Sequence, residues 1–204
     1  MTGRIVILNG APRAGKSSIA AAILSGFDGP WLNLGVDAMA VATPEHLRPG
    51  IGLRPGGERP DLEDFVVRTY GALYDAIAEC ARAGTNIVAD VGHHDDYSRP
   101  LGILKDCARR LEGLPVLFVG VRCPLDEIMR RRNAGSEGNY LKGTEDDPIP
   151  APVRRWQDAV HTPGVYDLEV DSSAMTPAEC AEAIRACLAR GPEGPTAFER
   201  LARS

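Results

Sequence analysis

The residues best suited to chemistry lie near the start of the chain, where residues 10–17 read Gly-Ala-Pro-Arg-Ala-Gly-Lys-Ser. This segment fits the pattern G-x-x-x-x-G-K-[ST], and it lies between the apolar run 5–8 and a helical stretch. Such a loop turns its backbone N–H groups and a helix N-terminus toward phosphate oxygens. Lys16 would then reach the β- and γ-phosphates of ATP, and the Ser17 hydroxyl would ligate Mg²⁺. The predicted nucleotide site comprises Gly10, Ala11, Pro12, Arg13, Ala14, Gly15, Lys16, Ser17 and Ser18.

Two carboxylates follow predicted strands. Asp37 comes after the run 31–36, and Asp90 ends the run 86–90. Ligands of open α/β sheets lie beyond the carboxyl ends of the strands, so both acids are expected near the phosphate loop. Asp37 could accept the proton of an attacking hydroxyl, or it could cap a helix that starts at Ala38, and the two roles are compatible. Asp90 fits the Walker-B pattern, which predicts that it holds Mg²⁺ or contacts the acceptor.

The segment after Asp90 contains His93, His94, Asp95 and Asp96. Two adjacent histidines cannot share one helix face, and no further histidine lies at metal-ligand spacing. We therefore interpret His93 and His94 as substrate-binding residues in a polar loop rather than as metal ligands.

Five arginines are candidates for neutralising charge on the transferred phosphoryl group, namely Arg130, Arg131, Arg132, Arg154 and Arg155. Three consecutive residues spread around most of a helix, so only one or two of the first three can face the site. The residue types do not decide among the five, and a role in complementing a helix dipole remains open. Arg131 is the candidate that we assign to catalysis.

The elements that must position these residues follow an alternating order. Short apolar runs alternate with longer helical stretches, which supply the crossovers that parallel strands require. This order predicts a three-layer α/β fold with a five-stranded parallel sheet. Together with the phosphate loop after the first strand, it predicts the P-loop nucleoside-triphosphate-hydrolase/kinase fold. The expected strands are 4–9, 31–36, 86–90, 116–121 and 166–170, and the expected helices include 16–25, 62–83, 126–132 and a segment that Thr176 caps.

We expect one kinase domain over residues 1–190. Two segments rich in proline, glycine and polar residues interrupt the pattern, and we interpret 43–61 as an acceptor loop and 133–152 as a lid. Residues 191–204 are expected to form a C-terminal tail after a Gly-Pro hinge.

Composition limits the classes of function. The chain has 204 residues, a net charge of −5 and five cysteines without a CxxC pair. These values argue against nucleic-acid binding and against a zinc or disulfide framework. The apolar runs are too short for a membrane span or a signal peptide, so a cytoplasmic protein is expected. A homo-oligomer remains open.

Taken together, these residues resemble the chloramphenicol phosphotransferase family of P-loop kinases over roughly residues 3–189. The phosphate loop alone is typical of a superfamily, whereas the segments after the second and fourth predicted strands and near residue 160 are more specific. The matching segments are 5–10, 15–18, 31–37, 119–124, 157–161 and 164–173.

The resemblance implies ATP-dependent transfer of the γ-phosphoryl group to a hydroxyl of chloramphenicol or a similar antibiotic, for resistance or self-protection. It also implies that Asp37 is the general base and that Asp171 begins a loop near the adenine. The sequence departs from the family at residues 133–138, which lack its usual arginines, and at the His- and Asp-containing loop 91–99. These departures predict a more polar acceptor, such as a sugar-bearing or cyclitol antibiotic. A metabolite or nucleotide-sugar kinase and a non-catalytic ATP sensor are the alternatives.

Overall fold

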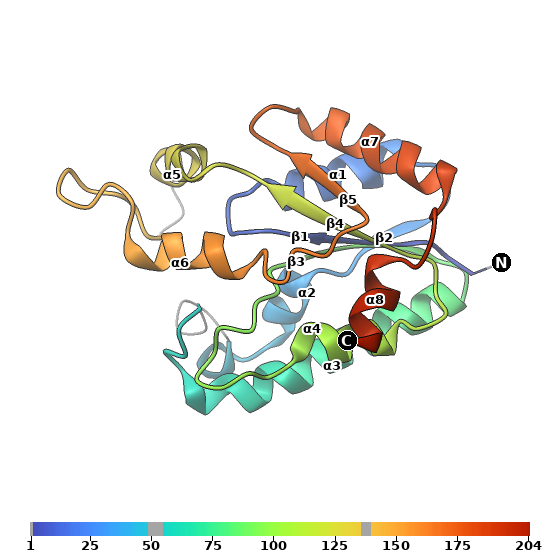
Figure 1. Ribbon diagram of the computed structural model, residues 1–204, viewed down its shortest axis with the longest axis horizontal. Helices are drawn as coiled ribbons and strands as arrows, with labels where there is room; N and C mark the ends of the chain where they lie inside the picture. Colours follow the sequence, from blue (N-terminus) through green and yellow to red (C-terminus); the bar gives the residue numbers. More distant parts are fainter. Residues whose placement is uncertain (1, 49–54, 136–139) are drawn as a thin grey trace.

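A five-stranded parallel sheet in the order β2-β3-β1-β4-β5 organises the chain (Figure 1). The computed structural model describes residues 2–48, 55–135 and 140–204. The three-layer prediction and the five strands are confirmed, although the second strand ends three residues earlier than expected. The strands are β1 (Ile5–Asn9), β2 (Trp31–Asn33), β3 (Asn86–Val91), β4 (Val116–Arg122) and β5 (Leu168–Asp171).

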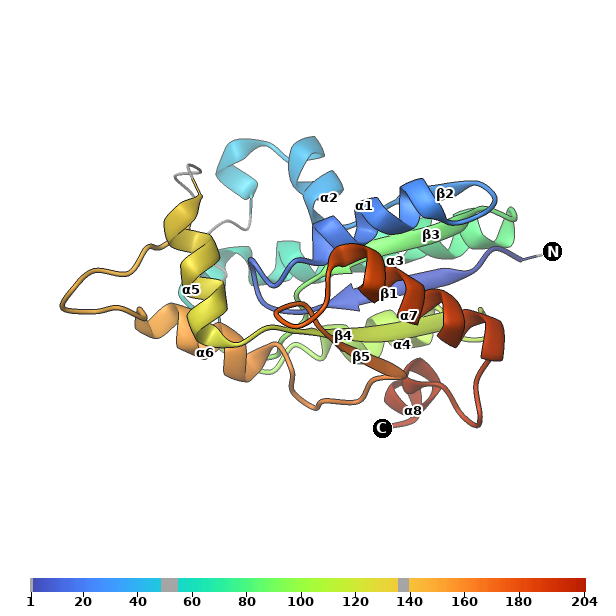
Figure 2. The ribbon, with the colours of Figure 1, turned by 90° about the horizontal axis from the view of Figure 1, so that it is seen from above.

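Helices cover both faces of the sheet (Figures 1 and 2). One face carries α1 (Lys16–Gly26) and α7 (Pro177–Arg190). The other carries α3 (Pro60–Arg82), α4 (Ile103–Arg110) and α8 (Ala197–Arg203). The chain also forms α2 (Val36–Ala42), a 3-10 turn (Glu45–Leu47), α5 (Leu125–Ala134) and α6 (Ala151–Ala159), with α5 and α6 beyond the carboxyl ends of the strands.

The central strand β1 is buried on both faces. Ile5 and Ile7 belong to the core shared with α3, α4 and α8, whereas Val6 and Leu8 belong to the core shared with α1 and α7. Side chains alternate across a strand, so a continuous apolar run is what a sheet covered on both faces requires. The phosphate loop that follows β1 therefore leaves the middle of the sheet from a rigid base.

The C-terminal tail predicted for residues 191–204 ends in a helix, α8, that packs on the sheet. In α8, Phe198 and Leu201 are each 3% exposed. The Ala197 amide donates to the Asp167 carboxylate at 2.6 Å, and a capping box at Thr196 begins the helix. An apolar stripe inside so short a segment was sufficient to dock it on the sheet.

Parts of the two predicted loops belong to helices and turns. Residues 43–61 include the turn Glu45–Leu47 and the start of α3, and residues 133–152 include the end of α5 and the start of α6. Residues 49–54 and 136–139 of these loops lie outside the described residues. The capping box predicted at Thr176 is present at the start of α7.

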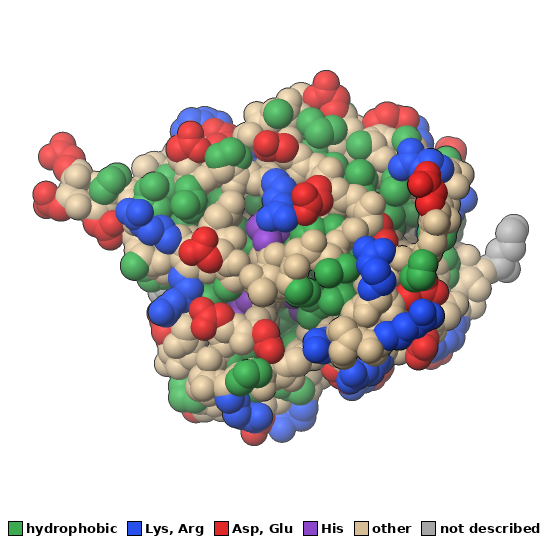
Figure 3. Space-filling model, in the orientation of Figure 1, with side chains coloured by type: hydrophobic (Ala, Val, Ile, Leu, Met, Phe, Trp, Pro, Cys, Tyr) green, Lys and Arg blue, Asp and Glu red, His purple; other side chains and the backbone are tan. Residues whose placement is uncertain are grey.

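Acidic and basic side chains are interspersed on the face seen in Figure 3. Within the described residues, no helix combines the length and the apolar character needed to cross a membrane.

Candidate active site

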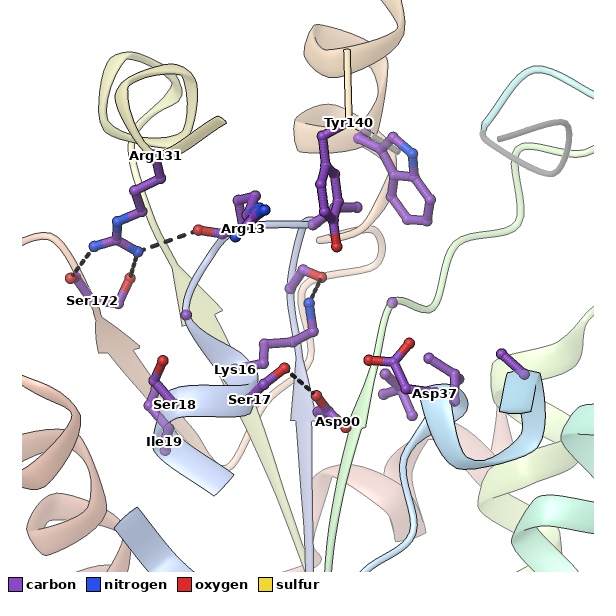
Figure 4. A pocket seen from close by; sticks show the side chains of 18 of the residues that line it. Arg13, Lys16, Ser17, Ser18, Ile19, Asp37, Asp90, Arg131, Tyr140 and Ser172 are labelled. Carbon is purple, nitrogen blue, oxygen red and sulfur yellow. Dashed lines mark hydrogen bonds between the residues drawn. The ribbon is translucent and has the colours of Figure 1, made fainter. Parts of the chain in front are cut away.

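The phosphate loop turns from β1 into α1 at the carboxyl end of the sheet (Figure 4). Gly15 has φ +91°, a conformation that residues with a side chain rarely adopt, and it stands immediately before the first turn of α1. Lys16 and Ser17 are consequently held at the helix N-terminus, where backbone N–H groups are free to bind an anion. The loop has the local geometry that the sequence pattern predicts.

Lys16 folds back over the loop. Its Nζ donates to the carbonyl oxygens of Gly10 at 2.8 Å and Ala11 at 3.0 Å. Burial lowers the pKa of Lys16 to about 8, and the negative charges of Asp90 and Asp37 act in the opposite direction. A bound triphosphate would offer Nζ stronger, charged acceptors than these two carbonyls.

Ser17 and Asp90 form the second polar pair. Ser17 Oγ donates to Asp90 Oδ2 at 2.7 Å, and Asp90 lies opposite Leu8 in the β1–β3 register. A hydroxyl beside a carboxylate fits Mg²⁺, which usually takes one or two protein oxygens and fills its shell with phosphates and water. Within the described residues, no group of three or more histidine, cysteine, aspartate or glutamate side chains is arranged so that it could hold a metal ion.

A glycine makes room for Asp90. A Cβ placed on Gly35 would lie 1.9 Å from Asp90 Oδ1. Gly35 also occupies the N-cap position of α2, so Asp37 stands inside the first turn of that helix. The alternative role of Asp37 as the capping residue is therefore wrong, because the helix begins one residue before it.

Asp37 faces the phosphate loop from α2, across the cavity from Lys16 (Figure 4). Partial burial raises the pKa of its carboxyl, and the nearby negative charge of Asp90 raises it further, whereas Lys16 opposes both effects. A carboxylate in this position can accept a proton from a hydroxyl that approaches the terminal phosphate.

Arg131 joins three segments around the loop. Its guanidinium donates to Ser172 O at 2.7 Å, Ser172 Oγ at 3.1 Å and Arg13 O at 3.3 Å, and it pairs with Glu127 at 2.7 Å. Ser172 Oγ in turn donates to Ala14 O at 2.7 Å. Arg131 and its neighbour Arg130 line the cavity, so α5 supplies two of the five candidate arginines to it.

These groups open into one cavity of about 930 Å³. Its far wall, beyond Asp37, is formed mainly by apolar and aromatic side chains from α2, α3, α6 and the loop after β3. The His94 ring lies 4.2 Å from the Tyr97 ring and 5.0 Å from the Trp156 ring, with the latter edge to face. The side chains of this wall are Val36, Met39, Thr43, Val66, Thr69, Tyr70, Leu73, His94, Tyr97 and Trp156.

The structure separates the predicted site residues into two groups. Most of them line the cavity: Gly10, Pro12, Arg13, Gly15, Lys16, Ser17, Ser18, Asp37, Asp90, His94 and Arg131. The others lie outside its lining. The side chains of Ala11 and Ala14 pack in the core, so these two residues can offer only backbone groups.

Two predicted site residues, His93 and Asp171, lie outside the cavity lining because each has other partners. His93 is 2% exposed and hydrogen-bonds the Tyr74 hydroxyl through Nε2 at 2.7 Å, so it is a core residue rather than a substrate contact. Burial lowers its pKa to about 3, which keeps the ring neutral. Asp171 accepts from Ser173 N at 2.8 Å and shapes the loop after β5, leaving Ser172 to line the cavity.

The far wall of the cavity, which we call the aromatic wall, was not identified from the sequence. Trp156 lies in α6, four residues beyond the end of the predicted lid, and Tyr97 lies in a loop that was noted for its charges. The helical apolar stripe of α3 was recognised, but Val66 and Leu73 face the cavity as well as the core. The sequence did contain one signal for this wall, because the large aromatic side chains of Tyr97 and Trp156 lie within or just after segments that were interpreted as polar loops.

A phosphate loop at the end of a central strand, opening into a walled cavity, is the arrangement of P-loop kinases, and the chain is a phosphotransferase of this class. The family profile described as chloramphenicol phosphotransferase-like protein matches residues 3–189, so the chain belongs to that family. It is also similar to a Mycobacterium tuberculosis (strain H37Rv) protein provisionally named O-phosphotransferase Rv2636, with 29% identity over 98% of this chain and 88% of the relative.

Solved structures support the fold. A sugar kinase from Janibacter sp. HTCC2649 has a TM-score of 0.64 at 17% identity, covering 92% of this chain and 95% of that chain. The APS kinase CysC of Mycobacterium tuberculosis has a TM-score of 0.59 at 17% identity, with 93% and 99% covered. A shikimate kinase from Acinetobacter baumannii has a TM-score of 0.58 at 11% identity, with 90% and 92% covered.

Proposed function

We propose that this enzyme transfers the γ-phosphoryl group of ATP to a hydroxyl of a small antibiotic of the chloramphenicol type, for resistance or self-protection. The observation that carries the proposal is the position of Asp37 at the junction of the phosphate loop and the aromatic wall. A hydroxyl bound there meets a base on one side and the terminal phosphate on the other. The family membership supports the same reaction type.

In the proposed reaction, the acceptor oxygen bonds to the γ-phosphorus while the bond from that phosphorus to the β,γ-bridging oxygen breaks, and ADP leaves. Asp37 receives the hydroxyl proton, and its raised pKa makes it a better proton acceptor than an ordinary aspartate. Lys16 holds the β- and γ-phosphates once they displace its contacts to Gly10 and Ala11. Mg²⁺, held by Ser17 with Asp90, would supply charge neutralisation at the phosphates.

The chemistry of the cavity wall favours an acceptor with an apolar, ring-bearing body over the more polar one that the loop 91–99 suggested. The charged residues of that loop turn elsewhere: Asp95 accepts from Leu101 N and Gly102 N, and Asp96 pairs with Arg155 at 3.7 Å. The residues of this loop that line the cavity are Val91, Gly92, His94 and Tyr97, and aromatic rings bind flat apolar surfaces well.

The test is an ATP-consumption assay with chloramphenicol, with sugar-bearing and cyclitol antibiotics, and with simple sugars and shikimate as metabolite acceptors. Mass spectrometry then identifies any product that carries an added phosphate. We expect phosphorylation of chloramphenicol or of another aromatic alcohol. Phosphorylation of a sugar or cyclitol alone would reject the aromatic acceptor in favour of a metabolite kinase or a polar antibiotic. ATP binding without turnover on any member of the panel would contradict the proposed antibiotic substrate.

A further inference from the structure

One buried side chain outside the cavity lining, that of Asn9, connects two segments that form the far wall of the cavity, the loop after β3 and α6. Asn9 is the last residue of β1, directly before the phosphate loop, and it is 1% exposed. A buried amide is stable only if its donor and acceptor groups are satisfied, and each group of Asn9 bonds a different segment of the chain.

The acceptor end of the amide holds the loop after β3. Asn9 Oδ1 accepts from the backbone N–H of His93 at 2.7 Å. The neighbouring His94 is part of the aromatic wall, whereas the His93 ring bonds Tyr74 of α3. Asn9 therefore fixes the backbone from which the His94 ring projects.

The donor end of the amide holds the end of α6. Asn9 Nδ2 donates to Val160 O at 2.8 Å and to the Tyr166 hydroxyl at 2.9 Å. Val160 is the C-cap of α6, and its N–H bonds the Trp156 carbonyl at 3.0 Å. The Tyr166 hydroxyl also lies 2.8 Å from His161 Nδ1, so this end of the amide reaches the turn that follows α6.

We propose that Asn9 is a positioning residue that sets the spacing between His94 and Trp156 and thereby shapes the acceptor half of the cavity. The inference rests on the proposed function only in naming that half the acceptor half. The His94 and Trp156 rings meet edge to face with their centroids 5.0 Å apart. Gly92 allows the Trp156 ring to lie close to the backbone of the loop after β3, because a Cβ on Gly92 would lie 3.3 Å from that ring. Asparagine is required because the position needs an acceptor for one segment and donors for the other. An aspartate keeps the acceptor and loses the donors.

The experiment measures the solvent exposure of Trp156 in the aromatic wall, and it needs no acceptor. The chain has two tryptophans, so Trp31→Phe leaves Trp156 as the single fluorescent reporter. In that background, acrylamide quenching of Trp156 is compared among the parent, Asn9→Asp and Asn9→Ser. The control is Asn33→Asp, which adds the same charge at the exposed end of β2. Melting temperature and the affinity for AMPPNP with Mg²⁺ are measured on the same samples.

Loss of the 2.8 Å bond from Asn9 leaves Val160 O with only the longer contact to the Tyr166 hydroxyl at 3.5 Å, so the end of α6 is held less firmly. We therefore expect Asn9→Asp to raise the quenching constant of Trp156 about twofold or more. We expect Asn9→Ser, which adds no charge and cannot span both segments, to act in the same direction. Asn33→Asp is expected to leave quenching unchanged, and AMPPNP affinity should change far less than Trp156 exposure. Unchanged Trp156 quenching in either folded Asn9 variant, even with a lowered melting temperature, would overturn the proposal. Loss of AMPPNP binding in proportion to Trp156 exposure would also overturn it, because Asn9 would then act on the phosphate loop.

Discussion

At the scale of single residues, the charge of Lys16 controls how tightly the phosphate loop can hold a nucleotide. Its pKa is about 8 in the nucleotide-free protein because it is buried, although Asp90 and Asp37 oppose that shift. Above this pH the free enzyme must take up a proton to present a charged Nζ, so the affinity for ATP should fall about tenfold per pH unit. Below it, this group should have no effect on affinity. Calorimetric titration with AMPPNP and Mg²⁺ between pH 7 and 9.5 measures the change.

The control for this pH dependence is Lys105→Met, which removes an exposed lysine from α4. This variant should keep the parent profile. An affinity that stays flat to pH 9.5 would show that Lys16 remains charged throughout.

Asp37 makes a second prediction at this scale. Asp37→Asn keeps the shape of the side chain and removes the base, so turnover should fall about 10²- to 10⁴-fold while ATP affinity is retained. Initial rates on the acceptor found by the panel, together with AMPPNP binding, measure the two quantities. Asp28→Asn, at an exposed aspartate after α1, is the matched control. A non-catalytic sensor would show little change in any measured property.

At the scale of elements, Gly35 shows how the turn into α2 supports the metal site. Gly35→Ala places a Cβ 1.9 Å from Asp90 Oδ1, so either the Asp90 carboxylate that accepts from Ser17 or the turn into α2 must shift. We expect weaker Mg²⁺-dependent AMPPNP binding and slower transfer, with the sheet intact by circular dichroism. The control is Gly26→Ala in the last turn of α1, where the added carbon meets the nearest atom at an ordinary 3.5 Å. Equal AMPPNP affinity in the two variants would contradict this dependence on Gly35.

The elements also show what a sequence can and cannot predict here. The phosphate loop and the strands were predictable because their signals are local: a glycine pattern, apolar runs and capping residues. The positions of Asp37 and Asp90 followed from the rule that ligands collect at the carboxyl ends of parallel strands. The aromatic wall was not predictable, because it depends on the packing of α6 against the loop after β3. The inward position of His93 was missed for the same kind of reason, since its partners Tyr74 and Asn9 lie far from it in sequence.

At the scale of the whole molecule, α8 packs the C-terminal residues against the face of the sheet that also carries α3 and α4. The Phe198 ring lies 5.0 Å from the Phe118 ring of β4 and 6.3 Å from the Tyr74 ring, and Tyr74 bonds His93. Phe198→Ala should therefore destabilise the protein by about 3–5 kcal/mol. For a chain of this size that corresponds to a fall in melting temperature of about 6–20 °C.

Calorimetry measures that fall, with Arg203→Ala at the exposed end of α8 as the control, for which the change should stay within about 0.5 kcal/mol. Because Phe198 is remote from the phosphate loop and α8 packs against α4 and β4, AMPPNP affinity well below the melting temperature should be unchanged. A melting temperature equal to that of the parent would mean that the packing of α8 contributes no stability to the folded protein. A large fall with AMPPNP affinity intact would instead establish that the chain end stabilises the sheet from which the site is built.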